Sequence, residues 1–211
     1  MSEPRLTVVE HPLVQHKLSY LRDRSTPTVH FRKLAEEITL LLTYEATKDM
    51  ATEDAEIETP LETMTAQRIS GKKVAVCPVL RAGMGMLDGV LSLVSSARVG
   101  FIGMYRDEET LEAVEYFVKL PVDLAERDAI ILDPMLATGH SSCAAIKAVK
   151  DAGAQAVTLV CIVSAPEGIA EVHRQHPDVH IVCAAVDREL NERGYIVPGL
   201  GDAGDRLYGT K

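Results

Sequence analysis

Three segments of the sequence combine glycines with side chains that bind anions or sugars. The first, residues 81–89 (RAGMGMLDG), begins with an arginine and contains three glycines. Glycines let a ligand approach the backbone closely, and the planar guanidinium of Arg81 suits a phosphate. The glycine spacing is one residue off the dinucleotide-binding fingerprint, and Asp107 stands roughly where a ribose-binding acid would be. Taken alone, this segment is compatible with a phosphate or nicotinamide loop and equally with a tight turn.

The second segment, residues 130–142 (IILDPMLATGHSS), passes from an apolar run into a helical pattern. Its backbone N–H groups, the hydroxyls of Thr138 and Ser141 and the helix dipole would together form a phosphate cradle. Asp133 ends the apolar run, where a carboxylate can accept hydrogen bonds from sugar hydroxyls. The lysine of a Walker A loop is absent. The alternative is that Thr138 or Ser141 only caps the helix.

The third segment is the tail at 195–209 (YIVPGLGDAGDRLYG). Residues 199–204 fit G-x-G-x-x-G, but the seven residues that follow are too few for a βαβ unit, which excludes a dinucleotide site here. Apolar residues at both ends predict that the tail packs onto the body and offers backbone groups to a small planar ligand. A flexible tail is the alternative.

These segments must be positioned by the elements around them. Uniformly apolar runs alternate with helical patterns, which predicts an α/β, doubly wound, mainly parallel central sheet of about five strands. Ligands of such sheets bind at the carboxyl ends of strands. Arg106 would lie there as a second cation for a phosphate; the alternative is that it only forms a surface ion pair with Asp107 or Glu109. The predicted strands are 74–80, 98–104, 129–132, 157–163 and 179–186, the helices are 28–49, 86–94, 141–152 and 167–176, the hairpin arm is 114–120, and 50–73 carries a weak strand signal.

Composition and charge exclude several classes of protein. The chain of 211 residues is expected to form a single domain, 1–211, and its 46% hydrophobic residues exclude overall disorder. A net charge of −9 argues against DNA, RNA or anionic lipid as partners. No membrane span or signal peptide is visible, which predicts a cytoplasmic protein with reduced core cysteines. Among the histidines at 173, 176 and 180, Pro177 breaks the helix before the last one and no carboxylate or cysteine completes a ligand set at a fixed spacing, so no protein-built metal site is expected.

Taken together, the segments resemble the uracil branch of the phosphoribosyltransferase family. The resemblance is carried by 78–89, 105–121, 133–142 and 195–210, and also by the N-terminal stretch 11–23. It implies a phosphoribosyltransferase-like fold with a β-arm and a C-terminal base-binding hood. It also implies transfer of the 5-phosphoribosyl group from 5-phospho-α-D-ribose 1-diphosphate to N1 of uracil, giving UMP and diphosphate in pyrimidine salvage. Pro134 matches the uracil branch, whereas His140 stands where the family more often has glycine.

The resemblance also implies roles for individual residues. The catalytic residues would be Arg106, Asp133 and Asp202. The ribosyl diphosphate would be bound by Arg81, Arg106, Asp133, Pro134, Met135, Leu136, Ala137, Thr138, Gly139, His140, Ser141 and Asp202. Uracil would be read by Ile196, Gly201, Asp202 and Ala203. Mg²⁺ would arrive with the diphosphate, held mainly by substrate oxygens and water.

The implied partners are small-molecule substrates, with no nucleic acid and no membrane, and the implied assembly is a homodimer or a larger homo-oligomer. Some relatives are activated allosterically by GTP, so the resemblance makes GTP a candidate activator. One alternative is a phosphoribosyltransferase-like regulatory protein that binds RNA, which would need a basic face. Another is a nicotinamide-dependent oxidoreductase, which leaves residues 133–142 unexplained.

Overall fold

The centre of the molecule is a mixed but mainly parallel sheet. The computed structural model describes residues 4–71, 74–106 and 113–210. The strand order is β1-β11-β10-β8-β4-β6-β7, in which only β7 runs antiparallel to its neighbour, and β5 and β9 pair with β4 and β10. The strands are β1 Arg5–Val8, β4 Ala75–Leu80, β5 Arg98–Val99, β6 Phe101–Arg106, β7 Ala113–Lys119, β8 Ala129–Leu132, β9 Met135–Leu136, β10 Val157–Ser164 and β11 His180–Val186.

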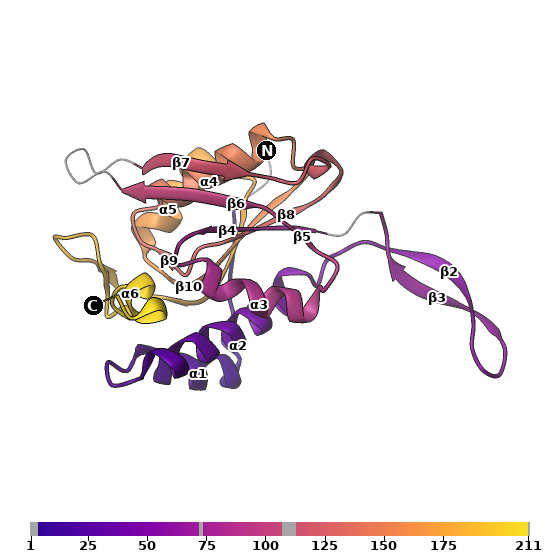
Figure 1. Ribbon diagram of the computed structural model, residues 1–211, viewed down its shortest axis with the longest axis horizontal. Helices are drawn as coiled ribbons and strands as arrows, with labels where there is room; N and C mark the ends of the chain where they lie inside the picture. Colours follow the sequence, from indigo (N-terminus) through magenta and orange to yellow (C-terminus); the bar gives the residue numbers. More distant parts are fainter. Residues whose placement is uncertain (1–3, 72–73, 107–112, 211) are drawn as a thin grey trace.

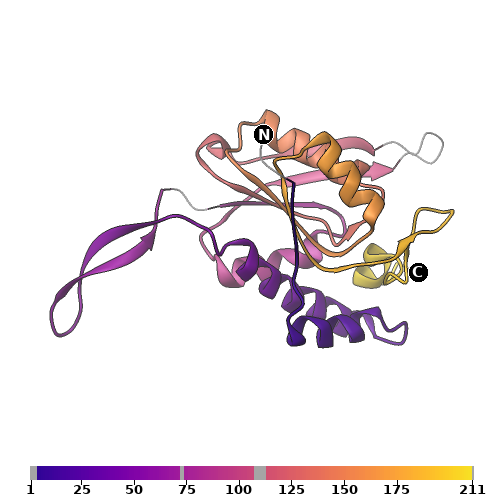
Figure 2. The same ribbon diagram turned by 180° about the vertical axis from the view of Figure 1, so that it is seen from behind.

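Helices cover both faces of this sheet, which explains why its strands are apolar throughout (Figures 1 and 2). In β8, Ile130 and Leu132 join the core on one face while Ala129 and Ile131 join the core on the other. The first core contains α1 Pro12–Arg22, α2 Thr28–Ala46 and α3 Met84–Leu93, and the second contains α4 His140–Asp151, α5 Pro166–Gln175 and the short helix η1 Leu124–Glu126. The doubly wound α/β architecture predicted from the sequence is confirmed.

The structure differs from the prediction at several elements, and it contains the helices α1 and η1, which were not predicted. The run at 98–104 is divided into β5 and β6, which leaves Gly100 between them. The weak signal at 50–73 is a complete hairpin of β2 Thr52–Glu58 and β3 Thr63–Ile69, which extends away from the sheet (Figure 1). Its side chains are mostly exposed, so it lacks the alternation that marks a half-buried strand. The predicted arm at 114–120 is β7, paired with β6.

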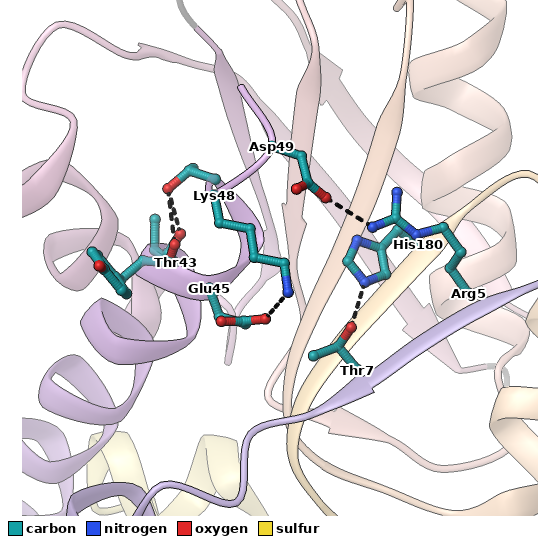
Figure 3. A network of polar contacts seen from close by, with 9 residues as sticks. Arg5, Thr7, Thr43, Glu45, Lys48, Asp49 and His180 are labelled. Carbon is teal, nitrogen blue, oxygen red and sulfur yellow. Dashed lines mark hydrogen bonds and ion pairs between the residues drawn. The ribbon is translucent and has the colours of Figure 1, made fainter. Parts of the chain in front are cut away.

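A further difference is β1, a four-residue edge strand that the sequence did not reveal. Polar contacts hold it at the amino-terminal end of β11 (Figure 3). Thr7 Oγ1 lies 2.9 Å from His180 Nε2, and the Arg5 guanidinium donates to Asp49 at 3.0 Å. Burial, followed by the charge of Arg5, lowers the pKa of His180, which therefore is neutral at pH 7. This network lies at the ends of the strands opposite to the loops that the sequence singled out.

Candidate functional site

A pocket of about 240 Å³ lies at the carboxyl ends of β4 and β8. It brings together residues from two of the three predicted segments. Its lining consists of Val79, Leu80, Arg81, Ala82, Met104, Asp133, Met135, Ala137, Thr138, Gly139, Ser141 and Ser142. Of the other predicted residues in the loop, Pro134 and Leu136 are buried and His140 is exposed. Segments 81–89 and 133–142 therefore meet at one edge of the sheet, as parallel strands require.

The carboxyl group of Asp133 is fixed where β8 ends. Its Oδ2 accepts a hydrogen bond from Ser142 Oγ at 2.9 Å, and its side chain faces the pocket. Burial raises the pKa of Asp133 to about 6, and hydrogen bonds from Ser142 and the Met135 N–H partly oppose that rise. The group is thus ionised at pH 7 and able to accept further hydrogen bonds from a ligand.

The start of α4 supplies backbone donors to the same pocket. The residue that caps this helix is Gly139, with φ +85° and no side-chain cap hydrogen bond. The alternative in which Thr138 or Ser141 only caps α4 is therefore wrong. N–H groups in the first turn of a helix have no partner within the helix, and the helix dipole favours an anion beside them.

Neighbouring elements hold this loop from behind. Pro134 O accepts from the N–H groups of Ile162 and Val163, and Leu136 O accepts from Ala165 N at 2.8 Å. A Cβ added to Gly168 on α5 would lie 2.4 Å from Ala137 O, so only glycine allows that helix to approach so closely. The loop is consequently fixed in its conformation by β10 and α5.

The glycines of segment 81–89 serve packing. A Cβ at Gly83 would lie 2.4 Å from Leu132 O, one at Gly85 would lie 2.6 Å from the Leu207 side chain, and one at Gly89 would lie 2.4 Å from Glu36 O. Protein atoms occupy the space that each Cβ would need, so glycine is required at these three positions by the packing of the protein itself. Arg81 itself is exposed at the pocket, and its peptide bond to Leu80 is cis.

A second pocket, of about 310 Å³, adjoins the first. Met135 and Ala137 line both. The remaining lining residues come from the tail and from the two residues before it, and they are Arg193, Gly194, Tyr195, Ile196 and Asp202. Arg193, Gly194 and Tyr195 were not among the predicted site residues; the only signal for them is that Tyr195 begins the apolar stretch of the tail and that the other two precede it.

The tail and the residues that lead into it form a folded unit, which we call the hood (residues 189–208). It contains β12 Glu189–Leu190, β13 Ile196–Val197 and α6 Ala203–Tyr208. Arg206 donates to Leu21 O at 2.7 Å and Leu200 O at 2.9 Å, and its guanidinium lies 4.4 Å from the centre of the Phe31 ring. The prediction that the tail packs onto the body is confirmed, and the flexible alternative is wrong.

Within the hood, the four residues predicted to read uracil are placed differently. Ile196 and Asp202 line the second pocket, whereas Gly201 and Ala203 are absent from its lining. Ala203 is buried, and Gly201 is exposed with φ +80°. Asp202 Oδ1 accepts from Asp205 N at 2.9 Å and so caps α6, which leaves its other oxygen available to a ligand.

Arg106 is the last residue of β6, and only its backbone is described. It pairs with Ala113 of β7. Because Leu80, the last residue of β4, pairs with Gly103 of the same strand β6, Arg106 lies toward the carboxyl end of β4. Asp107 and Glu109, the predicted ribose acid and ion-pair partner, lie outside the described residues. The four cysteines are buried and free, as predicted. Across residues 4–71, 74–106 and 113–210, no cluster of three or more His, Cys, Asp or Glu could hold a metal.

The comparisons with known proteins agree with one another. The family model described as uracil phosphoribosyltransferase matches residues 8–210. The uracil phosphoribosyltransferase of Staphylococcus aureus strain Newman is 56% identical over 207 residues, which cover 98% of this chain and 99% of the relative. The AQ2163 protein of Aquifex aeolicus superposes with a TM-score of 0.93 at 38% identity, covering 98% of this chain and 99% of that one.

A more distant neighbour shows the fold alone. The adenine phosphoribosyltransferase of Thermoanaerobacter pseudethanolicus has a TM-score of 0.51 at 12% identity, over 76% of this chain and 85% of that one. The sheet, the loop after β8 (residues 133–142, which we call the cradle) and these matches define a phosphoribosyltransferase-type protein. Within that class, the chain belongs to the uracil phosphoribosyltransferase family. None of the described helices is long and apolar enough to cross a membrane.

Proposed function

We propose that this chain is a pentosyltransferase that forms UMP and diphosphate from uracil and 5-phospho-α-D-ribose 1-diphosphate. Beside the family membership, one observation carries the proposal. A pocket with a helix N-terminus and an acid adjoins a second pocket under the hood, and the two share Met135 and Ala137. Two joined pockets suit a reaction in which two bound substrates must meet.

The reaction makes limited demands on the side chains. The bond from N1 of uracil to C1 of the ribose forms, the C1–O bond breaks, the diphosphate leaves with the electron pair, and the N1 proton is released. The ribose passes through an oxocarbenium-like state, as in glycoside hydrolysis, so no covalent nucleophile is required. What accelerates such a step is orientation of the substrates, stabilisation of the leaving charge and exclusion of water.

The first pocket would hold the phosphoribosyl group. Backbone donors at 137–141 and the hydroxyls of Thr138 and Ser141 suit the 5-phosphate. Asp133 is ionised at pH 7 and would accept hydrogen bonds from the ribose hydroxyls. Its raised pKa has a consequence, because activity should fall as the pH drops toward about 6 and the carboxylate becomes protonated.

The diphosphate would lie between the loops that carry the two arginines. Arg81 is exposed at the first pocket, and Arg106 ends the neighbouring strand β6. Mg²⁺ supplies charge neutralisation for the diphosphate when bound. The described residues fit a metal that depends on substrate oxygens, since Asp133 and Asp202 line separate pockets and no carboxylate cage surrounds them.

The second pocket would take the base. Backbone groups of Ile196, which lines this pocket, and of Gly201 and Ala203, which flank the lining residue Asp202 in sequence, are proposed to read the edge of uracil. Asp202 would lie between base and diphosphate. A donor–acceptor pattern built for uracil rejects cytosine, because the exocyclic amine that replaces O4 leaves polar groups unpaired.

The finer expectations belong to this proposal too. We place the protein in the cytoplasm as a single domain, 1–211, in a homodimer or larger homo-oligomer, and retain GTP as a candidate activator. The RNA-binding alternative needs a basic face, against which the net charge of −9 argues. A filter-binding titration that found salt-sensitive RNA affinity would favour it.

The deciding experiment is an assay for UMP from uracil and the ribosyl diphosphate with Mg²⁺ present. We expect activity in the wild type, and a loss of about 10²-fold or more in kcat/KM for Arg106→Ala, with unchanged circular dichroism. Folded wild-type protein that produced no UMP would overturn the proposed function. A fully active Arg106→Ala variant would remove that arginine from the proposed site.

A further inference from the structure

The turn that follows β13 connects the residues proposed to read uracil. Ile196 precedes it and Gly201 follows it, and Gly199 lies between them with φ +63°. A Cβ at Gly199 would fall 2.1 Å from Ile196 O, so the backbone here folds back tightly on itself. Any rotation of the Gly199 peptide groups would reorient the backbone on both sides, and with it the edge offered to a base.

One ion pair holds both peptide groups of this turn. Arg22, at the end of α1, donates from Nη1 and Nη2 to the two carboxylate oxygens of Asp187, at 2.7 and 2.6 Å. Asp187 Oδ2 also accepts from Gly199 N at 2.8 Å, and Arg22 Nη1 also donates to Gly199 O at 2.7 Å. The pair therefore binds the N–H and the C=O of the same glycine.

The pair is also well shielded from water. The side chain of Asp187 is 5% exposed and that of Arg22 is 22% exposed. In such surroundings, removing one partner leaves the other charge uncompensated, and the nearby groups rearrange to solvate it. The hood has separate attachments through Arg206 and Tyr208, so the fold does not depend on this pair alone.

We propose that Arg22 and Asp187 are positioning residues for the base, which fix the Pro198–Gly199 turn so that the backbone around it presents the uracil-reading edge. They act through Gly199 and line neither pocket. The proposal rests on the proposed function, because it assumes that the pocket under the hood takes uracil. It extends the site to a residue 177 positions away from that glycine in sequence.

The test compares Asp187→Asn with Asp123→Asn, steady-state kinetics being measured for both substrates. Asp123 forms a matched pair with Arg127 at 2.8 and 3.1 Å, and the side chains are 24% and 8% exposed. This control pair lies beside η1, at the amino-terminal end of β8. We expect Asp187→Asn to raise KM for uracil by about 10-fold with less than about 3-fold change in KM for the ribosyl diphosphate. The control should change neither KM.

Two further measurements separate positioning from general destabilisation. Hydrogen exchange in the segment 196–201 should become faster in Asp187→Asn, by about 10-fold, and stay unchanged in Asp123→Asn. The double variant Arg22→Gln with Asp187→Asn has no uncompensated charge and can form a neutral hydrogen bond. Its KM for uracil should therefore be lower than that of either single variant.

The outcomes are distinct. Equal changes in both KM values, or no change in either, would overturn the positioning role, as would unchanged exchange at 196–201. A wild type that makes no UMP would overturn the proposed function, and the exchange measurement would then decide alone whether the pair holds the turn. If Asp187→Asn fails to fold, the double variant carries the same comparison against wild type.

Discussion

The cradle after β8 and the hood line adjoining pockets, but they are held in place by different kinds of contact. In the cradle, Asp133 is bound by Ser142, nine residues away, and the positive φ of Gly139 starts α4. In the hood, Arg206 reaches Leu21 O across 185 residues, and Tyr208 reaches Arg81 O across 127. The cradle is held by its own segment and by β10 and α5, which follow it closely in the chain, whereas the hood is held by residues from the first half of the chain.

Because of this difference, we expect the cradle to be the more rigid part of the site and the hood to be the more adjustable part. The cradle is fixed by the ends of buried strands, so changes there should alter both chemistry and binding of the ribosyl diphosphate. The hood is fixed by Leu200 and Leu207, which are buried in the first core, and by a few polar contacts that bridge α1, α2 and the loop after β4. Loosening it should mainly weaken binding of the base, and each contact should contribute a modest share.

The largest effect is expected for Asp133→Asn in the cradle. The substitution keeps the size and one acceptor oxygen but removes the charge that would bind the ribose hydroxyls. We expect kcat/KM to fall by about 10²-fold or more, measured by UMP formation at pH 7.5. Wild-type rates in this variant would contradict the role assigned to the cradle acid.

The same variant should have the opposite effect on stability. Burial raises the pKa of Asp133 from 3.8 to about 6, so folding favours its protonated form. The wild type therefore has this contribution in full below pH 3.8 and loses it as the pH rises to about 6. Urea unfolding at pH 4.5 and pH 7 should show that this decline is absent in Asp133→Asn. A variant with the wild-type pH dependence would contradict the burial of the charge.

Gly139→Ala tests whether the cradle depends on one backbone conformation. Its φ is +85°, and the new Cβ would lie 3.0 Å from Gly168 O. We expect a loss of about 1–2 kcal/mol in the free energy of unfolding and about a 10-fold rise in KM for the ribosyl diphosphate. Gly153→Ala is the matched control, because Gly153 follows the other end of α4 with φ +95°. The control should lose similar stability and keep both KM values.

The cradle could be predicted from the sequence more fully than the hood, because its contacts are closer together in the chain. Strand β8 and the start of α4 were predicted to within one residue, because buried runs and a glycine at a helix start are local signals. The prediction that Arg81 and Asp133 lie at the same pocket followed from the rule that parallel strands end at one edge of the sheet. For the hood, the sequence predicted only that it packs onto the body, because apolar residues in the tail do not indicate which residues they contact.

Two features could not be predicted from local patterns. Strand β1 is short and half-exposed, and its contact with His180 depends on a register between residues 173 positions apart. The glycines of 81–89 had the right type for a ligand loop, but only the packed structure shows that Leu132, Leu207 and Glu36 lie against them. A glycine pattern indicates close approach without identifying what approaches.

Arg206→Met tests the strongest attachment of the hood. The guanidinium donates to Leu21 O and Leu200 O and lies over Phe31, and methionine keeps only the apolar stem. We expect a loss of about 2–3 kcal/mol in stability and a several-fold rise in KM for uracil, with KM for the ribosyl diphosphate unchanged. Arg188→Met is the control, because Arg188 precedes the hood and is exposed. A rise in both KM values would show that the hood and cradle are not separate in the way described.

The smallest effect is expected for Tyr208→Phe, which removes a hydroxyl that joins the hood to the Arg81 loop. That hydroxyl donates to Arg81 O at 2.9 Å, and Tyr208 is 38% exposed, so water can replace it as a donor. The expected loss is about 0.5–1 kcal/mol in stability. Because the bond bridges the two regions, both KM values should rise equally, by no more than about 2–3-fold. Tyr44→Phe, at an exposed tyrosine of α2, should change nothing. A change confined to uracil would assign Tyr208 to the hood alone and make the Arg81 loop independent of it.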